Sequence, residues 1–144
     1  MKNLLLPVLL ACATLASGCG DREHYAAHRA ERSRPKMEVD SGMVSIRRAP
    51  YPNLDILPDG RLRVDDIEIP LDAEQRGLLQ TSFVKLQILR QNTLTDTTAV
   101  PDASGRTVPL QVPAGTRPFP PDLAERIPEF KEYSEALANP RARR

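Results

Sequence analysis

The chain contains no tryptophan, and aromatic residues make up only 4% of its 144 residues. The core of a folded domain must therefore be built mainly from leucine, isoleucine and valine. Cysteine is almost as scarce, because Cys12 and Cys19 are the only two and both lie near the N-terminus. Residues 20–144 contain no cysteine, so they have no disulfide and no free thiol. Non-covalent packing alone must stabilise them.

Groups that commonly carry catalysis are also scarce. Neither histidine lies beyond residue 28, no glycine-rich loop follows a predicted strand, and no serine has a base nearby in the sequence. Paired acids could serve glycoside hydrolysis, and five cluster around predicted turns: Asp55, Asp59, Asp65, Asp66 and Glu68. Carboxylates on exposed turns ordinarily form the turn. We therefore expect no enzyme and no cofactor, with a carboxylate-based hydrolase as the weaker alternative.

The first 19 residues, MKNLLLPVLLACATLASGC, have the pattern of a secretory signal, with a positive Lys2, an apolar run and small residues before Cys19. The run LASGC resembles the lipobox of bacterial lipoproteins, in which the cysteine is acylated and becomes the first mature residue. Cys12 is a competitor, but it would leave a very short apolar core. The apolar run before Cys19 is also too short for a membrane span, which needs about 20 apolar residues. The prediction is a signal peptide over residues 1–18 and a palmitate-bearing Cys19.

This resemblance implies a location. A lipoprotein cysteine normally carries three acyl chains, and several chains together hold a protein permanently on a membrane. Gly20 stands where aspartate is the usual signal for retention in the inner membrane of such lipoproteins. Glycine favours the outer membrane, with the protein facing the periplasm. A plain secreted protein is the alternative.

Charge balances beyond the signal. Removing residues 1–18 takes away one lysine, so 19 basic residues (20 − 1) remain against 19 acidic ones. A chain without a general basic field is not expected to bind nucleic acid. Residues 19–41 are dense in charge of both signs and have hardly any apolar periodicity, so they cannot bury enough surface to order themselves. They are predicted to be a lipidated tether.

The tether holds one pattern that could carry chemistry. His24 and His28 are four residues apart and Glu31 follows three later, so a helix would align two imidazoles and a carboxylate for zinc or nickel. Ligand spacing without packed supporting groups is weak evidence. We therefore predict no metal site and keep the two histidines as weak candidates.

Residues 42–144 are predicted to form a single small α+β domain. Apolar and polar residues alternate as in half-buried strands, and Pro58-Asp59-Gly60 favours a tight turn. The alternation changes parity at Asp65-Asp66, which predicts a second turn or a bulge. The apolar positions of the resulting antiparallel meander are Val44, Ile46, Leu54, Ile56, Leu62, Val64, Ile67 and Ile69.

One long amphipathic helix should cover this meander. Asp72 and Gln75 have the spacing of a capping box, and the helix is predicted to continue to about Leu94. Its apolar stripe contains Leu78, Leu79, Phe83, Leu86 and Leu89. A stripe of leucine and phenylalanine at this spacing is far more often a core face than a ligand groove.

Residues 95–121 are rich in proline and lack regular periodicity, apart from one possible strand over 106–112. Long irregular segments are usually functional or disordered. The functional interpretation is a partner-contact loop that presents Arg117 and Phe119; the favoured alternative is a segment that wraps the core. A final helix is predicted from Asp122, capped with Glu125 and broken at Pro128, to Ala138. The basic tail over residues 141–144 is expected to be loose.

The run DGRLRVDDIEIPLDAEQRGLLQTSF, residues 59–83, resembles a segment of the YggN-like family of proteobacterial periplasmic proteins. In that segment a hairpin with an Asp-Gly turn leads through an apolar strand into a helix. The resemblance covers less than a quarter of the chain and includes no catalytic signature. It implies an envelope location and no mechanism.

These observations together predict a lipid-anchored periplasmic protein that acts by binding another envelope protein without catalysis. A sharper version is an inhibitor or immunity protein for a toxic envelope enzyme. The alternative is a structural or accessory role in envelope maintenance or assembly.

Overall fold

The structure is a computed structural model that describes residues 25–26, 29–30 and 33–144. The chain divides into two compact units, Met1–Arg34 and Pro35–Arg144. Residues 25–26 and 29–30 of the first unit are helical. All the strands of the described residues, and the long helix, belong to the second unit.

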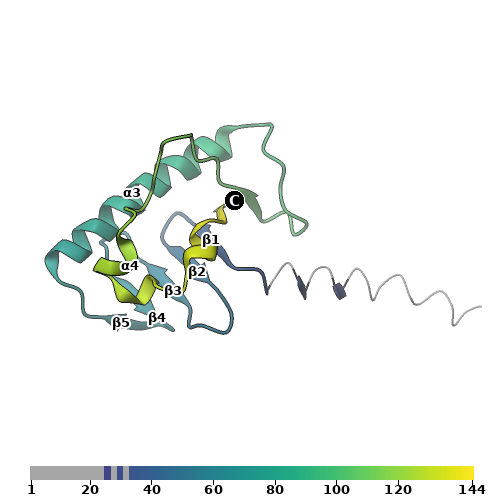
Figure 1. Cartoon of the computed structure of the whole chain (residues 1–144). Coiled ribbons are helices and arrows are strands. Elements are labelled where there is room, and N and C mark those ends of the chain that lie inside the picture. The colour runs from purple at the N-terminus through teal and green to yellow at the C-terminus, as the bar shows by residue number, and fades with distance from the viewer. Residues whose placement is uncertain (1–24, 27–28, 31–32) are drawn as a thin grey trace, which may run out of the picture. The chain divides into compact units, whose positions relative to one another are not determined.

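The second unit is a mixed α and β structure with one seven-stranded sheet, in which the strands have the order β5-β4-β3-β2-β1-β7-β6 (Figure 1). All neighbouring strands are antiparallel except β1 and β7, which are parallel. The strands are β1 (Lys36–Val39), β2 (Val44–Arg47), β3 (Leu54–Ile56), β4 (Leu62–Val64), β5 (Ile67–Ile69), β6 (Thr107–Pro109) and β7 (Pro140–Arg143). Strands β2 to β5 form the predicted meander, and β1, β6 and β7 make the sheet larger than that meander.

Strand β1 corrects the predicted domain boundary. It lies inside the segment predicted to be tether, yet Met37 pairs with Ile46 of β2 on one side and with Pro140 of β7 on the other. Met37 and Val39 are completely buried, while Lys36 and Glu38 point to the other face. A four-residue alternation is easily hidden in a charged run. The folded unit therefore begins at Pro35 and not at residue 42.

Strand β7 corrects the prediction of a loose basic tail. Its backbone is paired on both sides, with β1 and with β6. Ala142 is its single fully buried side chain, whereas Arg143 is exposed. Because the ladder of backbone hydrogen bonds can hold a strand that is poor in apolar residues, composition alone did not reveal it.

The two predicted turns are confirmed. Gly60 has a φ of +79° and its N–H donates to the carbonyl of Leu57 at 3.0 Å. Val64 and Ile67 pair directly across a two-residue turn, in which Asp65 and Asp66 have φ values of +47° and +69°. Aspartate tolerates this left-handed region better than most residues, and the turn suits the twist of a hairpin.

Helix α3 (Ala73–Thr95) is the predicted long helix, one residue longer than expected. Its capping box is confirmed, since the Gln75 N–H donates to Asp72 Oδ1 at 2.8 Å and the Asp72 N–H donates to Gln75 Oε1 at 3.0 Å. The buried side chains of α3 include four of the five predicted stripe residues: Leu79, Phe83, Leu86 and Leu89. They pack on the sheet.

The predicted final helix is three short ones: α4 (Leu123–Arg126), the 3-10 helix η2 (Pro128–Phe130) and α5 (Ser134–Leu137). The break at Pro128 is confirmed, and Asp122 stands at the N-cap position of α4, but its side chain does not make the predicted capping hydrogen bond. The Asp122 carboxylate instead accepts a hydrogen bond from Arg126 Nε at 2.7 Å, one turn along α4. The segment buries five side chains in the core: Leu123, Ile127, Phe130, Tyr133 and Ala136.

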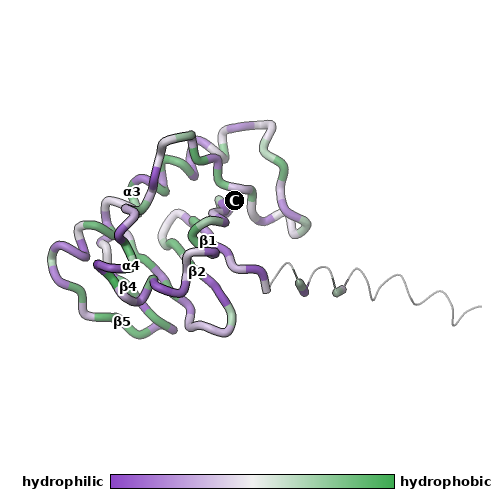
Figure 2. The backbone as a smooth tube through the Cα atoms, viewed as in Figure 1, coloured by the Kyte–Doolittle hydropathy of each residue, from purple (hydrophilic) through white to green (hydrophobic). Residues whose placement is uncertain are grey.

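All helices of the second unit share one core with one face of the sheet. Hydrophobic and hydrophilic residues alternate along the strands (Figure 2), and the register places the apolar ones on a common face. The opposite face carries the polar residues of the strands. The unit is therefore a two-layer structure with one face of its sheet free of helices among the described residues.

Candidate functional site

The outer side of α3 carries a long strip without charged residues. At 100° per residue, eight positions turn away from the buried side of the helix. Seven of them are exposed and Gly77 is partly buried. We call them the charge-free strip: Ala73, Gly77, Gln80, Thr81, Val84, Ile88, Gln91 and Thr95.

Val84 and Ile88 form the apolar centre of the charge-free strip. They lie one turn apart, and 52% of Val84 and 57% of Ile88 is exposed to solvent. The neighbouring threonines add apolar surface, because the Thr81 hydroxyl donates to the carbonyl of Gly77 at 2.9 Å and the Thr95 hydroxyl to that of Gln91 at 3.1 Å. Because these hydroxyls already donate to helix carbonyls, a partner can cover the two threonines without leaving a hydroxyl donor unpaired.

The charged residues of α3 lie beside the strip, and two of them contact neighbouring segments. Glu74 Oε1 lies 3.0 Å from Arg126 Nη1 of α4, and Arg90 Nε donates to the carbonyl of Arg143 at 3.1 Å. A solvent-facing helix side normally carries the charges. Depletion of charge with exposed aliphatic residues is instead typical of the core of a protein interface.

The helix-free face of the sheet has the opposite character. The register aligns Glu68, Arg63 and Asp55 on β5, β4 and β3. Asp55 is only 5% exposed and its Oδ1 lies 2.9 Å from Arg47 Nη1, which also donates to the carbonyl of Leu54 at 3.0 Å. Two ion pairs lie on this face, Arg47 with Asp55 and Lys36 with Glu38 at 2.7 Å, whereas Arg63 has no carboxylate within ion-pair distance among the described residues.

The turn carboxylates, considered above for hydrolysis, mostly hold the turns together. Asp59 Oδ2 lies 2.7 Å from Arg61 Nε, and Arg61 Nη1 lies 3.1 Å from Glu68 Oε2. Asp65 Oδ1 accepts the backbone N–H of Asn53 at 2.8 Å. Desolvation raises the pKa of the Asp59 carboxyl, but hydrogen bonds and the charge of Arg61 outweigh it and leave that pKa below its ordinary value. A general acid needs the reverse shift.

Of the two predicted partner-contact residues, Arg117 and Phe119, one is exposed and the other is partly buried. Phe119 is partly buried and packs against the core, with its ring centroid 6.2 Å from that of Phe130. Arg117 is exposed. At Phe119 the segment therefore wraps the core, and only Arg117 is presented freely to solvent.

The N-terminal candidates Cys19, His24 and His28 lie outside the described residues. Within residues 25–26, 29–30 and 33–144, no group of three metal-ligating side chains is close enough to hold an ion. In the same part of the chain no helix has the length and hydropathy needed to span a bilayer. A small depression of about 120 Å³ lies at the N-terminus of α3, lined by Asp72, Glu74, Gln75, Leu78 and Arg126.

No protein-family model, curated protein or solved structure matches the chain significantly. The resemblance of residues 59–83 to the YggN-like family remains a prediction from the sequence. The absence of charge from these eight positions is visible in the sequence, although the buried apolar stripe is the stronger signal in the same helix.

Proposed function

We propose that the protein is a lipoprotein anchored through Cys19 to the bacterial envelope, facing the periplasm and most simply on the outer membrane, where it binds another envelope protein without catalysis. The observation that carries the binding proposal is the charge-free strip of α3. Exposed Val84 and Ile88 stand at its centre, on a rigid helix that is packed against the sheet through its other side.

The size of the strip sets the strength of the proposed contact. A helix of 23 residues is about 35 Å long at 1.5 Å per residue, and one side of it is about 10 Å wide, so the strip offers about 350 Å². A standard interface buries about 800 Å² per partner. The partner must therefore also cover flanking residues, or the complex is transient. Blocking of a toxic enzyme, which requires tight binding, needs the larger contact.

The test is an affinity pull-down from envelope extract with residues 20–144 as bait and mass identification of the bound proteins. Ile88→Glu should abolish capture of a stoichiometric partner, because it puts a charge in the centre of the strip. The matched control is Ser134→Glu, the same change of charge at an exposed position of α5. Capture that is equally strong with Ile88→Glu would refute the strip as the binding surface.

Three further variants separate the alternatives. Arg117→Ala tests the proline-rich segment, and loss of capture there with Ile88→Glu unaffected would move the binding surface to that segment. Absence of any saturable partner would favour a structural or accessory role in envelope maintenance. Asp65→Asn and Asp66→Asn test the hydrolase alternative, because asparagine also tolerates a positive φ and preserves the turn. Rescue of every deletion phenotype by these variants would exclude it.

A further inference from the structure

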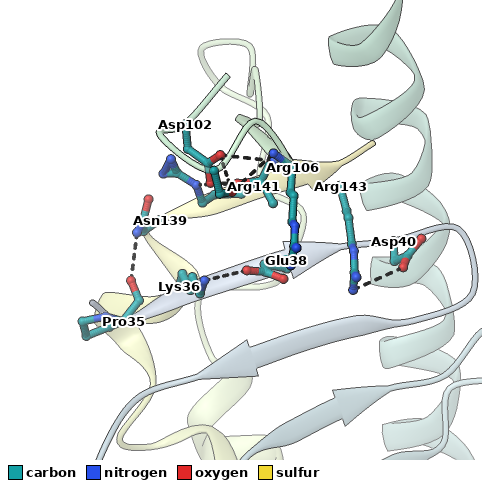
Figure 3. A network of polar contacts seen from close by, with 11 residues as sticks. Pro35, Lys36, Glu38, Asp40, Asp102, Arg106, Asn139, Arg141 and Arg143 are labelled. Carbon is teal, nitrogen blue, oxygen red and sulfur yellow. Dashed lines mark hydrogen bonds and ion pairs between the residues drawn. The ribbon is translucent and has the colours of Figure 1, made fainter. Parts of the chain in front are cut away.

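Four arginines from three distant parts of the chain meet at one corner of the sheet. The Arg144 N–H donates to the carbonyl of Arg106 at 3.1 Å, and Arg90 Nε of α3 donates to the carbonyl of Arg143 on β7 at 3.1 Å. Arg106 and Arg143 extend side by side toward β1 (Figure 3). We call Arg90, Arg106, Arg143 and Arg144 the arginine corner.

Ion pairs engage little of this corner, because Glu38 of β1, drawn near Arg106 in Figure 3, is paired with Lys36 at 2.7 Å. Among the described residues, Asp40 is the only carboxylate within ion-pair distance of the four side chains, and it lies 3.7 Å from Arg143 Nη1. Both side chains of that pair are at least 40% exposed, so solvent weakens the attraction. Asp102, close by, is occupied by Thr107 and Ser104, whose hydroxyls donate to it at 2.5 and 2.7 Å. Most guanidinium donors of the corner therefore remain available.

We propose that the arginine corner docks on anionic phospholipid headgroups of the membrane to which the chain is anchored. Guanidinium groups bind phosphate through paired hydrogen bonds, which makes arginine better suited than lysine to this role. The mature chain has no net charge, so attraction to an anionic surface must come from a local cluster of this kind.

The proposed anchor selects the membrane as the occupant. Cys19 and Pro35 are sixteen Cα–Cα steps apart (35 − 19), and at no more than about 3.5 Å per step the segment between them spans at most about 56 Å. The start of the folded unit at Pro35 therefore stays within about 56 Å of an anchored Cys19, and so near the headgroup phosphates. The inference rests on the proposed envelope location, but headgroup binding is measurable on a chain without lipid.

The test uses residues 20–144, unlipidated, in sedimentation with vesicles of phosphatidylcholine alone or mixed with phosphatidylglycerol. Arg106→Gln with Arg144→Gln should weaken binding to the mixed vesicles about 25-fold, which corresponds to about 1 kcal/mol per arginine. The matched control, Arg76→Gln with Lys131→Gln, removes the same charge from exposed positions elsewhere and should leave binding within about 2-fold, since screening limits distant charges.

Salt-sensitive binding to the mixed vesicles that only the corner variant loses would support the proposal. Equal loss in both variants, equal binding to pure phosphatidylcholine, or no binding of the unsubstituted chain would overturn it. Because the chain in this test carries no acyl group, these outcomes do not depend on lipidation of Cys19. Partner capture in the pull-down is likewise independent of them, so the two proposals fail separately.

Discussion

The substitution Gly60→Ala probes how the β3–β4 turn meets α3. A methyl group at Gly60 would lie 2.1 Å from the carbonyl oxygen of Arg76, a distance at which two atoms cannot coexist. The backbone of Arg76 cannot easily retreat, because its N–H closes the first turn of α3 on the carbonyl of Asp72 at 3.0 Å. Gly60 also has a φ of +79°, which alanine adopts at a cost of about 1–2 kcal/mol.

The two costs can be measured separately. Forced overpacking adds about 1–3 kcal/mol, so Gly60→Ala should lower the free energy of unfolding by about 2–5 kcal/mol. Gly105→Ala is the control, because Gly105 has a φ of +68° but no atom within 4 Å of an added methyl group; it should lose only about 1–2 kcal/mol. Urea unfolding of residues 20–144, followed by circular dichroism, gives both values. Equal losses in the two variants would show that the turn and the helix do not approach each other as described.

Three other predictions concern the stability of the second unit. A chain that starts at residue 42 lacks the strand between β2 and β7 and should fail to show cooperative unfolding, whereas one that starts at residue 35 should unfold like residues 20–144 in the same urea titration. Burial alone would raise the pKa of the Asp102 carboxyl, but hydrogen bonds and a neighbouring arginine lower it to about 2, so its stabilisation is present above about pH 4 and is lost as the pH falls toward 2. Asp102→Asn should therefore cost about 1–2 kcal/mol at pH 7 and clearly less near pH 2.5, and a pH-independent cost would contradict this linkage. Tyr133→Phe removes the hydroxyl that donates to the carbonyl of Pro52 at 2.6 Å and should cost about 1 kcal/mol in thermal unfolding; an unchanged midpoint would show that the hydrogen bond adds nothing.

The surfaces proposed for binding differ in how far the sequence could have revealed them. The charge-free strip lies on one helix, so its period of 3.6 residues is present in the sequence. The arginine corner was not predictable in this way. Arg90, Arg106 and Arg143 are brought together only because β7 lies between β1 and β6 while α3 packs behind them. From the sequence, Phe119 and Arg117 were equally good candidates for contact with a partner. Only the contact of Phe119 with Phe130 shows that Phe119 packs against the core.

Local features of this protein were determined by the sequence itself: the capping box at Asp72, the turns at Gly60 and Asp65-Asp66, and the buried stripe of α3. Each depends on backbone and side-chain preferences within a few residues, which act the same way in any fold. The places of β1 and β7 were decided only by tertiary structure. Residues 36–39 and 140–143 are about 100 positions apart, and neither has a strong strand composition. They become strands because each satisfies the other's backbone hydrogen bonds, and that requirement is met only when the whole sheet assembles.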